Sequence, residues 1–132
     1  MAATFKFELV SPERILMSSE AEQVVVPGSE GLFTVLPDHA PVISTLAPGV
    51  IQVTTPDSKK GIFVQSGFAD VTGDSLTILA ERAFIVDEVD TRQIEQELDA
   101  AHKALESADS DEARYFIGRA IDELKALLAE AA

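Results

Sequence analysis

Few residues of this chain could act as acids, bases or nucleophiles, and their spacing matches no known catalytic arrangement. His39 and His102 lie far apart, and neither belongs to an H-E-x-x-H or other paired-histidine motif. Asp38-His39 could join a serine such as Ser44 or Ser66 in a catalytic triad. A triad is defined by its geometry, however, and adjacency in the sequence does not supply that geometry. We therefore expect neither a triad nor a transition-metal site.

Phosphate chemistry and acid–base chemistry are equally poorly supported. The sequence contains no Walker A pattern and no G-x-G-x-x-G, so the glycine-rich phosphate cradles are absent. Its one basic doublet, Lys59-Lys60, is typical of a solvent-exposed turn. Acidic pairs such as Asp87-Glu88 and Asp122-Glu123 are common on helix surfaces, and acid–base catalysis would need them in a buried pocket. The sequence therefore predicts a non-catalytic protein without a cofactor.

Composition restricts the possible partners. The formal net charge of −13 makes nucleic acid and anionic lipid poor partners, because both bind clustered Lys and Arg. Cysteine is absent, which excludes disulfides and thiolate metal sites. Residues 1–10 alternate in polarity and do not read as a signal peptide. No apolar run approaches the roughly 18 residues of a membrane span. We expect a water-soluble binding subunit that any membrane complex would hold through other proteins.

Residues 1–86 have the character of a β domain. All six prolines lie between Pro12 and Pro56. Phe5, Phe7 and Leu9 alternate with charged residues, which is the period of a half-buried strand. Turn signals such as Pro27-Gly28 and Gly73-Asp74 divide the rest into short runs, a pattern typical of a sandwich or barrel. Further strands are predicted over 24–26, 32–36, 50–53, 62–64, 68–71, 76–79 and 83–86.

Two features of this part matter for the site. Val24, Val25, Val26 and Leu32 are apolar residues of predicted strands, so by default we expect them in the core. The segment 28–31, Gly-Ser-Glu-Gly, is a polar loop between two strands. It is either a simple hairpin connection or a loop that contacts a partner.

Residues 87–132 have the character of two helices. Asp90 is a predicted N-cap, with Gln93 completing a capping box. Residues 107–110 form a polar break, after which Asp109 and Glu112 can cap a second helix. A short connection makes the two helices antiparallel neighbours. The apolar residues expected to pack the hairpin are Ile94, Leu98, Leu105, Phe116, Ile117, Ile121 and Leu124.

The first helix contributes only three large apolar residues to the hairpin. Burying one such side chain stabilises by about 1.5–3 kcal/mol, whereas ordering the backbone costs about 1–2 kcal/mol per residue. The hairpin should therefore be marginal alone. Both a permanently docked hairpin and a mobile one agree with the sequence.

One stretch resembles a known family. Residues 31–49 read GLFTVLPDHAPVISTLAPG, with P-x-H-A-P followed by L-x-P-G. This is similar to the hallmark segment of the epsilon subunits of rotary ATP synthases. The likeness continues through residues 63–71 (FVQSGFADV) and 76–83 (LTILAERA), and it then covers the helical part.

The resemblance implies a fold and a set of partners. The fold is α+β: an antiparallel sandwich of about ten strands (1–86) and a C-terminal αα-hairpin (87–132). The role is that of a non-catalytic rotor subunit in the central stalk of a proton-translocating ATP synthase, on the cytoplasmic face of a bacterial inner membrane. By position, the residues facing the c-ring would be Ser29, Glu30, Gly31 and Leu32, and those facing the gamma subunit would be Ser11, His39 and Ser44.

The resemblance also implies a regulatory hairpin, which in some members contacts the catalytic alpha and beta subunits and inhibits ATP hydrolysis. Here the second helix is acidic, so we expect weak inhibition. Some members bind ATP through a D-x-x-R-A motif. Arg92 follows Asp90 by two residues instead of three, so we expect no ATP binding. Ser66 stands where the family often has glycine, and a positive φ at Ser66 would be strained.

Two other classes of function remain open from the residues. One is an adaptor whose hairpin recruits a helical partner. The other is a small-molecule-binding β-barrel, which would require an open apolar cavity that a flattened sandwich should fill.

Overall fold

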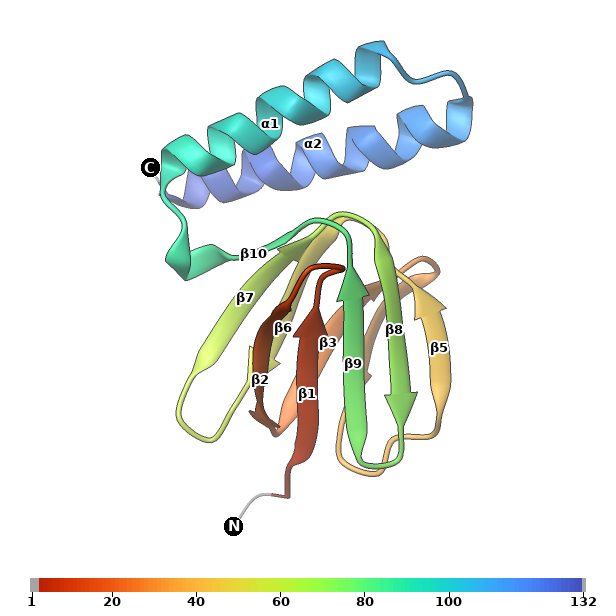
Figure 1. Ribbon diagram of the computed structural model, residues 1–132, viewed down its shortest axis with the longest axis vertical. Helices are drawn as coiled ribbons and strands as arrows, with labels where there is room; N and C mark the ends of the chain where they lie inside the picture. The colour runs from red at the N-terminus through yellow and green to blue at the C-terminus, as the bar shows by residue number, and fades with distance from the viewer. Residues whose placement is uncertain (1–2, 132) are drawn as a thin grey trace. The chain divides into compact units, whose positions relative to one another are not determined.

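A computed structural model describes residues 3–131, which form ten strands followed by two α-helices (Figure 1). The chain divides into two compact units between Val86 and Asp87. The first unit is a β-sandwich and the second is an antiparallel helical hairpin. The predicted α+β fold is confirmed.

Each layer of the sandwich is a five-stranded sheet. The first sheet has the order β2-β1-β9-β8-β5, and the second has the order β10-β7-β6-β3-β4. The strands are β1 (Phe5–Val10), β2 (Ile15–Ala21), β3 (Gln23–Gly28), β4 (Gly31–Val35), β5 (Val42–Thr45), β6 (Gly49–Thr54), β7 (Lys59–Val64), β8 (Gly67–Thr72), β9 (Ser75–Ala80) and β10 (Ala83–Ile85).

One pairing departs from the antiparallel pattern that was expected. β1 lies parallel to β9, in a register from Lys6 opposite Ser75 to Val10 opposite Leu79. The other named pairings among the described strands are antiparallel. A tight turn cannot join two parallel strands, and here the strands β2 to β8 separate β1 from β9 along the sequence.

The core between the sheets follows the alternation seen in the sequence. Phe5, Phe7 and Leu9 of β1 are buried, as are Leu76 and Ile78 of β9. The second sheet adds buried side chains on its inner face: Val24, Val26, Val35, Ile51, Val53, Ile62 and Val64. This continuous apolar layer is what holds the two sheets together.

Two strands were not predicted from the sequence, and two core assignments were wrong: Leu32 is exposed, and Val25 is half-buried on the outer face of β3, between the buried Val24 and Val26. β2 and β5 are edge strands of the first sheet, and both combine apolar with polar residues. Because an edge strand is less enclosed, it needs fewer apolar residues and gives a weaker signal. Leu32, expected in the core by default, is 73% exposed. It lies on β4, which is the edge strand of the second sheet.

The positive φ that would have strained Ser66 occurs instead at the next residue, Gly67. Its φ is +145°, whereas Asp38 is the residue other than glycine that has a positive φ within the described part of the chain. A Cβ on Gly67 would lie 1.9 Å from the backbone oxygen of Leu79. The glycine is therefore required both for its dihedral angle and for the close approach of β9.

A one-turn 3₁₀ helix, Val86–Glu88, spans the boundary between the two units, and α1 (Thr91–Glu106) and α2 (Asp111–Ala131) follow it. The predicted capping box is present. Asp90 Oδ1 accepts a hydrogen bond from the Gln93 backbone N–H at 2.9 Å, and the Gln93 side chain accepts one from the Asp90 N–H at 3.0 Å. Both bonds satisfy donors that a helix start leaves unpaired.

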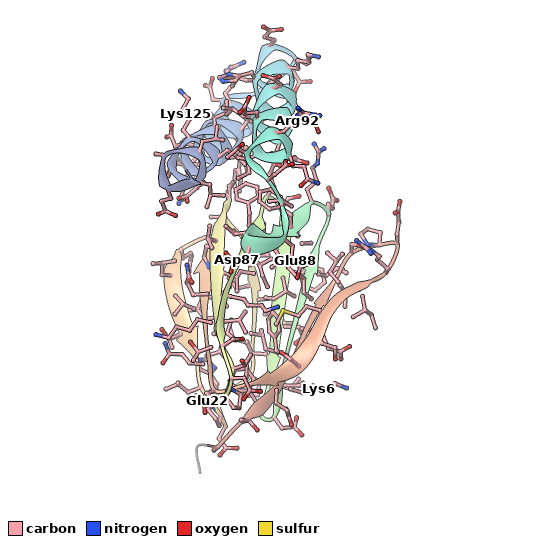
Figure 2. All side chains as sticks on the ribbon, turned by 90° about the vertical axis from the view of Figure 1, so that its left-hand side faces the viewer. Lys6, Glu22, Asp87, Glu88, Arg92 and Lys125 are labelled. Carbon is pink, nitrogen blue, oxygen red and sulfur yellow. The ribbon has the colours of Figure 1, made fainter. Side chains whose placement is uncertain are left out.

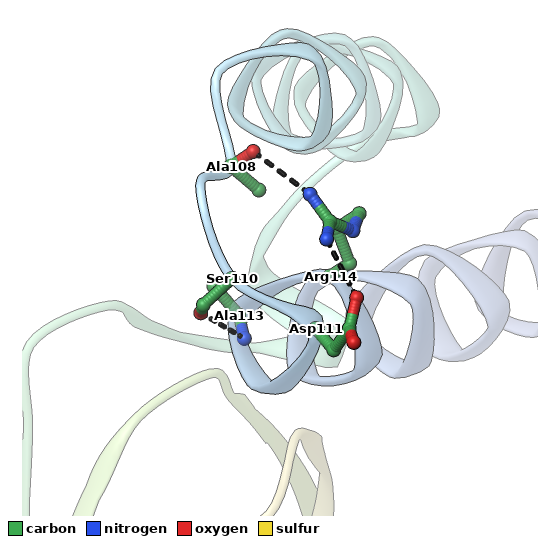
Figure 3. A network of polar contacts seen from close by, with 5 residues as sticks. All are labelled: Ala108, Ser110, Asp111, Ala113 and Arg114. Atoms are coloured by element: carbon green, nitrogen blue, oxygen red, sulfur yellow. Dashed lines mark hydrogen bonds and ion pairs between the residues drawn. The ribbon is translucent and has the colours of Figure 1, made fainter.

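The second cap differs from the prediction. Ser110, and not Asp109, accepts the hydrogen bond from the Ala113 N–H at 3.0 Å (Figure 3). Arg114 closes the connection between the helices. Its guanidinium donates to the Ala108 carbonyl at 3.2 Å and pairs with Asp111 at 2.6 Å (Figure 3). The sequence pattern placed the cap within one residue of its position, which is the usual uncertainty of helix boundaries.

The residues expected to pack the hairpin differ in burial. Ile94, Ile121 and Leu124 are buried, and the others are half-buried: Leu98, Leu105, Phe116 and Ile117. Neither helix, over its described residues, is both long and apolar enough to cross a membrane.

Candidate partner-binding surface

The residues that the resemblance assigns to the c-ring form the turn between β3 and β4. Gly28 pairs with Gly31, so Ser29 and Glu30 are the two turn residues between them. Gly31 has a φ of +128°, a value that residues other than glycine rarely adopt. Ser29 and Glu30 are exposed, and Leu32 follows them on the edge strand. The turn therefore presents a carboxylate beside an exposed apolar side chain.

His39 lies in a tight turn between β4 and β5. Its N–H donates to the Leu36 carbonyl at 3.1 Å. Because Pro37 fixes a negative φ and Asp38 has a φ of +64°, the turn is of type II. His39 Nδ1 is 2.7 Å from the Ala40 carbonyl oxygen, so Nδ1 carries the hydrogen and donates it. In the neutral ring, Nε2 then remains as an acceptor for a partner.

Thr45 connects the two sheets, and the hydroxyl of its neighbour Ser44 donates to the Thr45 carbonyl at 3.0 Å. The Thr45 hydroxyl donates to Ser29 Oγ at 2.8 Å, and the Ser29 N–H donates to the Thr45 carbonyl at 2.9 Å. Gly28 also forms an isolated bridge with Leu46. The β3–β4 turn and the end of β5 are therefore tied directly to each other, although they belong to different sheets.

A groove runs between the two edge strands β4 and β5 and has a volume of about 370 Å³. Both sets of predicted residues contribute to it. Glu30, Gly31 and Leu32 line one side, and His39 and Ser44 line the other. Ser29 is joined to this site through its bonds to Thr45. The remaining lining residues are Phe33, Ala40, Pro41 and Val42.

Ser11 lies outside the groove. Its hydroxyl donates to the Arg14 carbonyl at 3.2 Å in the turn that follows β1. Between β1 and β5 lie β9 and β8, so three strand spacings, or roughly 14 Å, separate it from β5. The strand registers pair Val10 with Leu79, Leu79 with Phe68, and Phe68 with Thr45, so these residues form one row across the sheet. Ser11 is therefore at the same end of the sheet as Ser44, but across its width.

The side chains of this surface are suited to binding a partner. Among the described lining residues, Glu30 provides the one carboxylate and His39 the one imidazole, while most of the lining is apolar. Within residues 3–131, no cluster of three His, Asp or Glu side chains could hold a metal ion. Such a surface can bury an apolar side chain of a partner and accept its hydrogen bonds.

The two residues of the degenerate ATP-binding motif, Asp90 and Arg92, both lie at the start of α1. Asp90 is engaged by the α1 capping box. Arg92 is exposed on the first turn of α1, and Figure 2 shows its side chain beside that helix.

The sequence analysis assigned no binding role to three exposed apolar residues near the groove, Leu36, Val42 and Ile43. Leu36 is 49% exposed and Ile43 is 73% exposed. A signal was available, because both lie close to the P-x-H-A-P turn: Leu36 directly follows β4, and Ile43 lies in the short edge strand β5.

The fold and the site define a binding protein built from a β-sandwich and a helical hairpin. Residues 4–86 match the family model described as ATP synthase, Delta/Epsilon chain, beta-sandwich domain. The ATP synthase epsilon chain of Brucella canis is 48% identical over 115 residues, covering 86% of this chain and 85% of that protein. The epsilon chain of Brucella anthropi is 47% identical over the same length. The chain belongs to the ATP synthase delta/epsilon family, which confirms the resemblance seen in the sequence.

Solved structures agree on the fold. A chain of the Euglena gracilis mitochondrial ATP synthase, in a structure of OSCP, F1 and the c-ring, matches with a TM-score of 0.72 at 22% identity. That match covers 98% of this chain and 82% of the other. A chain from the central stalk and c-ring of the Tetrahymena thermophila enzyme matches with a TM-score of 0.66 at 12% identity, covering 93% and 95%.

Proposed function

We propose that this chain is a non-catalytic rotor subunit that joins the c-ring of an ATP synthase to its gamma subunit. The observation that carries this proposal is the groove between β4 and β5. Two residue sets assigned to different partners line that single groove, and hydrogen bonds between Ser29 and Thr45 tie them together. Family membership, and 48% identity to an epsilon chain over 86% of this chain, support the same role.

The mechanism requires stiffness and no bond-making chemistry. Glu30 and Leu32 meet the polar loops of the c-ring, with the carboxylate facing basic groups there. His39, Ser44 and Ser11 meet gamma. Torque applied at the β3–β4 turn passes to β5 through the Ser29–Thr45 bonds and through the sandwich core, whose packed side chains resist deformation.

In this role the protein is peripheral, on the cytoplasmic face of a bacterial inner membrane. It is held there by its partners. The hairpin regulates ATP hydrolysis weakly through transient contact with the alpha and beta subunits. The second helix supports weak regulation, because Arg114 already pairs with Asp111 and acidic residues outnumber basic ones along α2.

The test is a pull-down of the full-length chain with its cognate gamma subunit. ATPase assays of the catalytic complex, with and without residues 87–132, accompany it. We expect micromolar or tighter binding that is lost when His39 and Ser44 are both changed to Glu. Retention of binding in that double variant would remove these residues from the interface. Absence of gamma binding by the unmodified chain would instead favour an adaptor that recruits another partner.

A further inference from the structure

A second groove lies on the side of the sandwich away from the groove between β4 and β5. It is called here the β2 groove, has a volume of about 420 Å³, and opens between β2 and the turn that joins β6 to β7. The Glu22 N–H donates to the Thr54 carbonyl at 2.7 Å, which ties the end of β6 to the chain just after β2. β2 and β5 are opposite edges of the first sheet, and Figure 1 shows β2 and β7 at one side of the sandwich and β5 at the other. The proposed function gives the β2 groove no role.

Ser19 contributes a buried hydroxyl to the lining of the β2 groove. The register pairs Ser19 with Phe7, a fully buried core residue, so both side chains lie on the inner face of the first sheet. Within residues 3–131, Ser19 Oγ has no hydrogen-bond partner. A buried hydroxyl without a partner costs free energy, and such groups in native proteins bond to protein, water or ligand. A molecule in the groove would therefore be a partner for Ser19.

Lys60 faces the β2 groove from the second sheet. It pairs with Val53, whose side chain is part of the core, so Lys60 also starts from the inner face of its sheet. Lys60 is half-buried, whereas the neighbouring Lys59 is exposed. An ammonium group has three N–H donors, so Lys60 can bind a ligand in addition to its contact within the protein. Together with Ser19, it supplies hydrogen-bond donors for a negatively charged group.

Two carboxylates belong to the same lining. Glu20 is exposed on β2, and Asp57 is exposed in the turn between β6 and β7. That turn is held by its own hydrogen bonds. The Thr55 N–H donates to the Ser58 carbonyl at 2.8 Å, and the Ser58 N–H donates to Thr55 Oγ1 at 3.0 Å. The groove therefore offers acceptors for a positively charged group on a turn of defined shape.

We propose that the β2 groove binds a small zwitterion, a molecule that carries both an ammonium and a carboxylate group, as free amino acids do. Lys60 and the Ser19 hydroxyl bind its carboxylate, and Glu20 and Asp57 bind its ammonium. A purely anionic ligand would be repelled by the two carboxylates of the groove and by the net charge of −13, and a purely cationic one by Lys60. A zwitterion pairs with groups of both signs. Because the groove is open to solvent, the dissociation constant should be millimolar.

The experiment follows the amide chemical shifts of the isotope-labelled full-length chain during a titration with glycine at constant ionic strength. Acetate and methylammonium, which each carry one of the two charged groups, are titrated in parallel. Lys60→Gln removes the inward-facing ammonium. Lys59→Gln is its matched control, because it removes the same charge from the opposite face of the same strand. Ser19→Ala removes the buried hydroxyl, and the spectra show whether each variant is folded.

We expect glycine to cause saturable shifts in residues 17–20 and 57–60, and each singly charged probe to bind at least about fivefold more weakly. Lys60→Gln should weaken glycine binding about tenfold and Ser19→Ala about threefold, while Lys59→Gln changes it by less than about twofold.

Three outcomes would overturn the proposal while leaving the proposed function intact. Absence of saturable shifts would mean that no zwitterion binds and that water alone meets the Ser19 hydroxyl. Acetate binding as tight as that of glycine would make the groove an anion site. Equal glycine affinity in Lys59→Gln and Lys60→Gln, with self-association of Lys60→Gln alone, would mean that the inward-facing lysine serves only to protect the sheet edge.

Discussion

The β-sandwich and the helical hairpin of this protein are stabilised in different ways. The sandwich encloses a continuous apolar core between two five-stranded sheets, built from strands that are distant in the sequence. The hairpin contains fewer buried side chains, among them Ile94, Ala101, Ala120 and Leu124. Several strand pairings of the sandwich join segments far apart in the sequence, whereas the hairpin is held by packing between two consecutive helices and by their caps.

This difference explains how the two regions can serve different purposes. A sandwich that transmits torque must have one stable shape, and tight packing provides it. A hairpin that rests on few buried residues has a small free energy of local opening, which is the property of elements that rearrange. Four substitutions test whether the two regions are stabilised in these different ways.

Gly67→Ala should cause the largest loss. Its Cβ would collide with the Leu79 oxygen at a distance of 1.9 Å, and its φ of +145° disfavours any side chain. We expect the free energy of unfolding to fall by more than about 4 kcal/mol in a urea titration. Gly73→Ala is the matched control, because nothing lies within 4 Å of its added Cβ. Similar losses in both variants would contradict the steric explanation.

Phe7→Ala should remove the centre of the sandwich core. Phe7 is fully buried on β1, between β2 and β9. Loss of its transfer free energy together with the resulting cavity should cost about 3–5 kcal/mol. Hydrogen exchange would show faster exchange throughout β1 and β9. Leu98→Ala, at a half-buried position of α1, should cost less and should speed exchange in the hairpin alone. If it also speeds exchange in the sandwich, the two regions are not separable.

Asp90→Ala should affect the start of α1 selectively. It removes the acceptor of the Gln93 N–H and with it half of the capping box. We expect a loss of about 1 kcal/mol in the opening free energy of α1, measured by hydrogen exchange of its first two turns. Asp99→Ala, an exposed change in the middle of the same helix, is the control. Unchanged exchange in Asp90→Ala would mean that packing alone fixes the helix start.

Gly118→Ala should stabilise the hairpin. Gly118 lies inside α2, and nothing lies within 4 Å of the position its Cβ would take. Glycine in a helix interior costs roughly 0.5–1 kcal/mol relative to alanine, so α2 should gain that amount. Slower amide exchange around residue 118 is the measurement. A destabilised helix would show that a contact absent from this structure needs the glycine.

Much of the fold followed from patterns within the chain. The alternation of Phe5, Phe7 and Leu9 predicted β1, and the Asp90–Gln93 spacing predicted the capping box that the structure contains. These features depend on residues a few positions apart, so the sequence records them directly. The misplaced cap at Asp109 is a small error of the same local kind, since Ser110 is the residue that accepts the bond.

Only part of the candidate site could be predicted from the sequence. The P-x-H-A-P turn drew attention to His39, and the polar loop drew attention to Glu30. The groove that unites them depends on β4 and β5 being the edges of different sheets. Strand order cannot be obtained from the composition of short strands. The same limitation placed Leu32 in the core, because an apolar residue of an edge strand has the same pattern as an internal one.

Patterns within the chain were enough to predict eight of the ten strands, the division between strands and helices, and the N-terminal cap of α1. The parallel pairing of β1 with β9 could be seen only in the folded chain, and with it the alignment of Val10, Leu79 and Phe68 in one row on the outer face of the first sheet. The physical reason is the range of the interactions. Periodicity and capping are set by neighbours along the chain, whereas the pairing of distant strands is set by how the two sheets close around a common core.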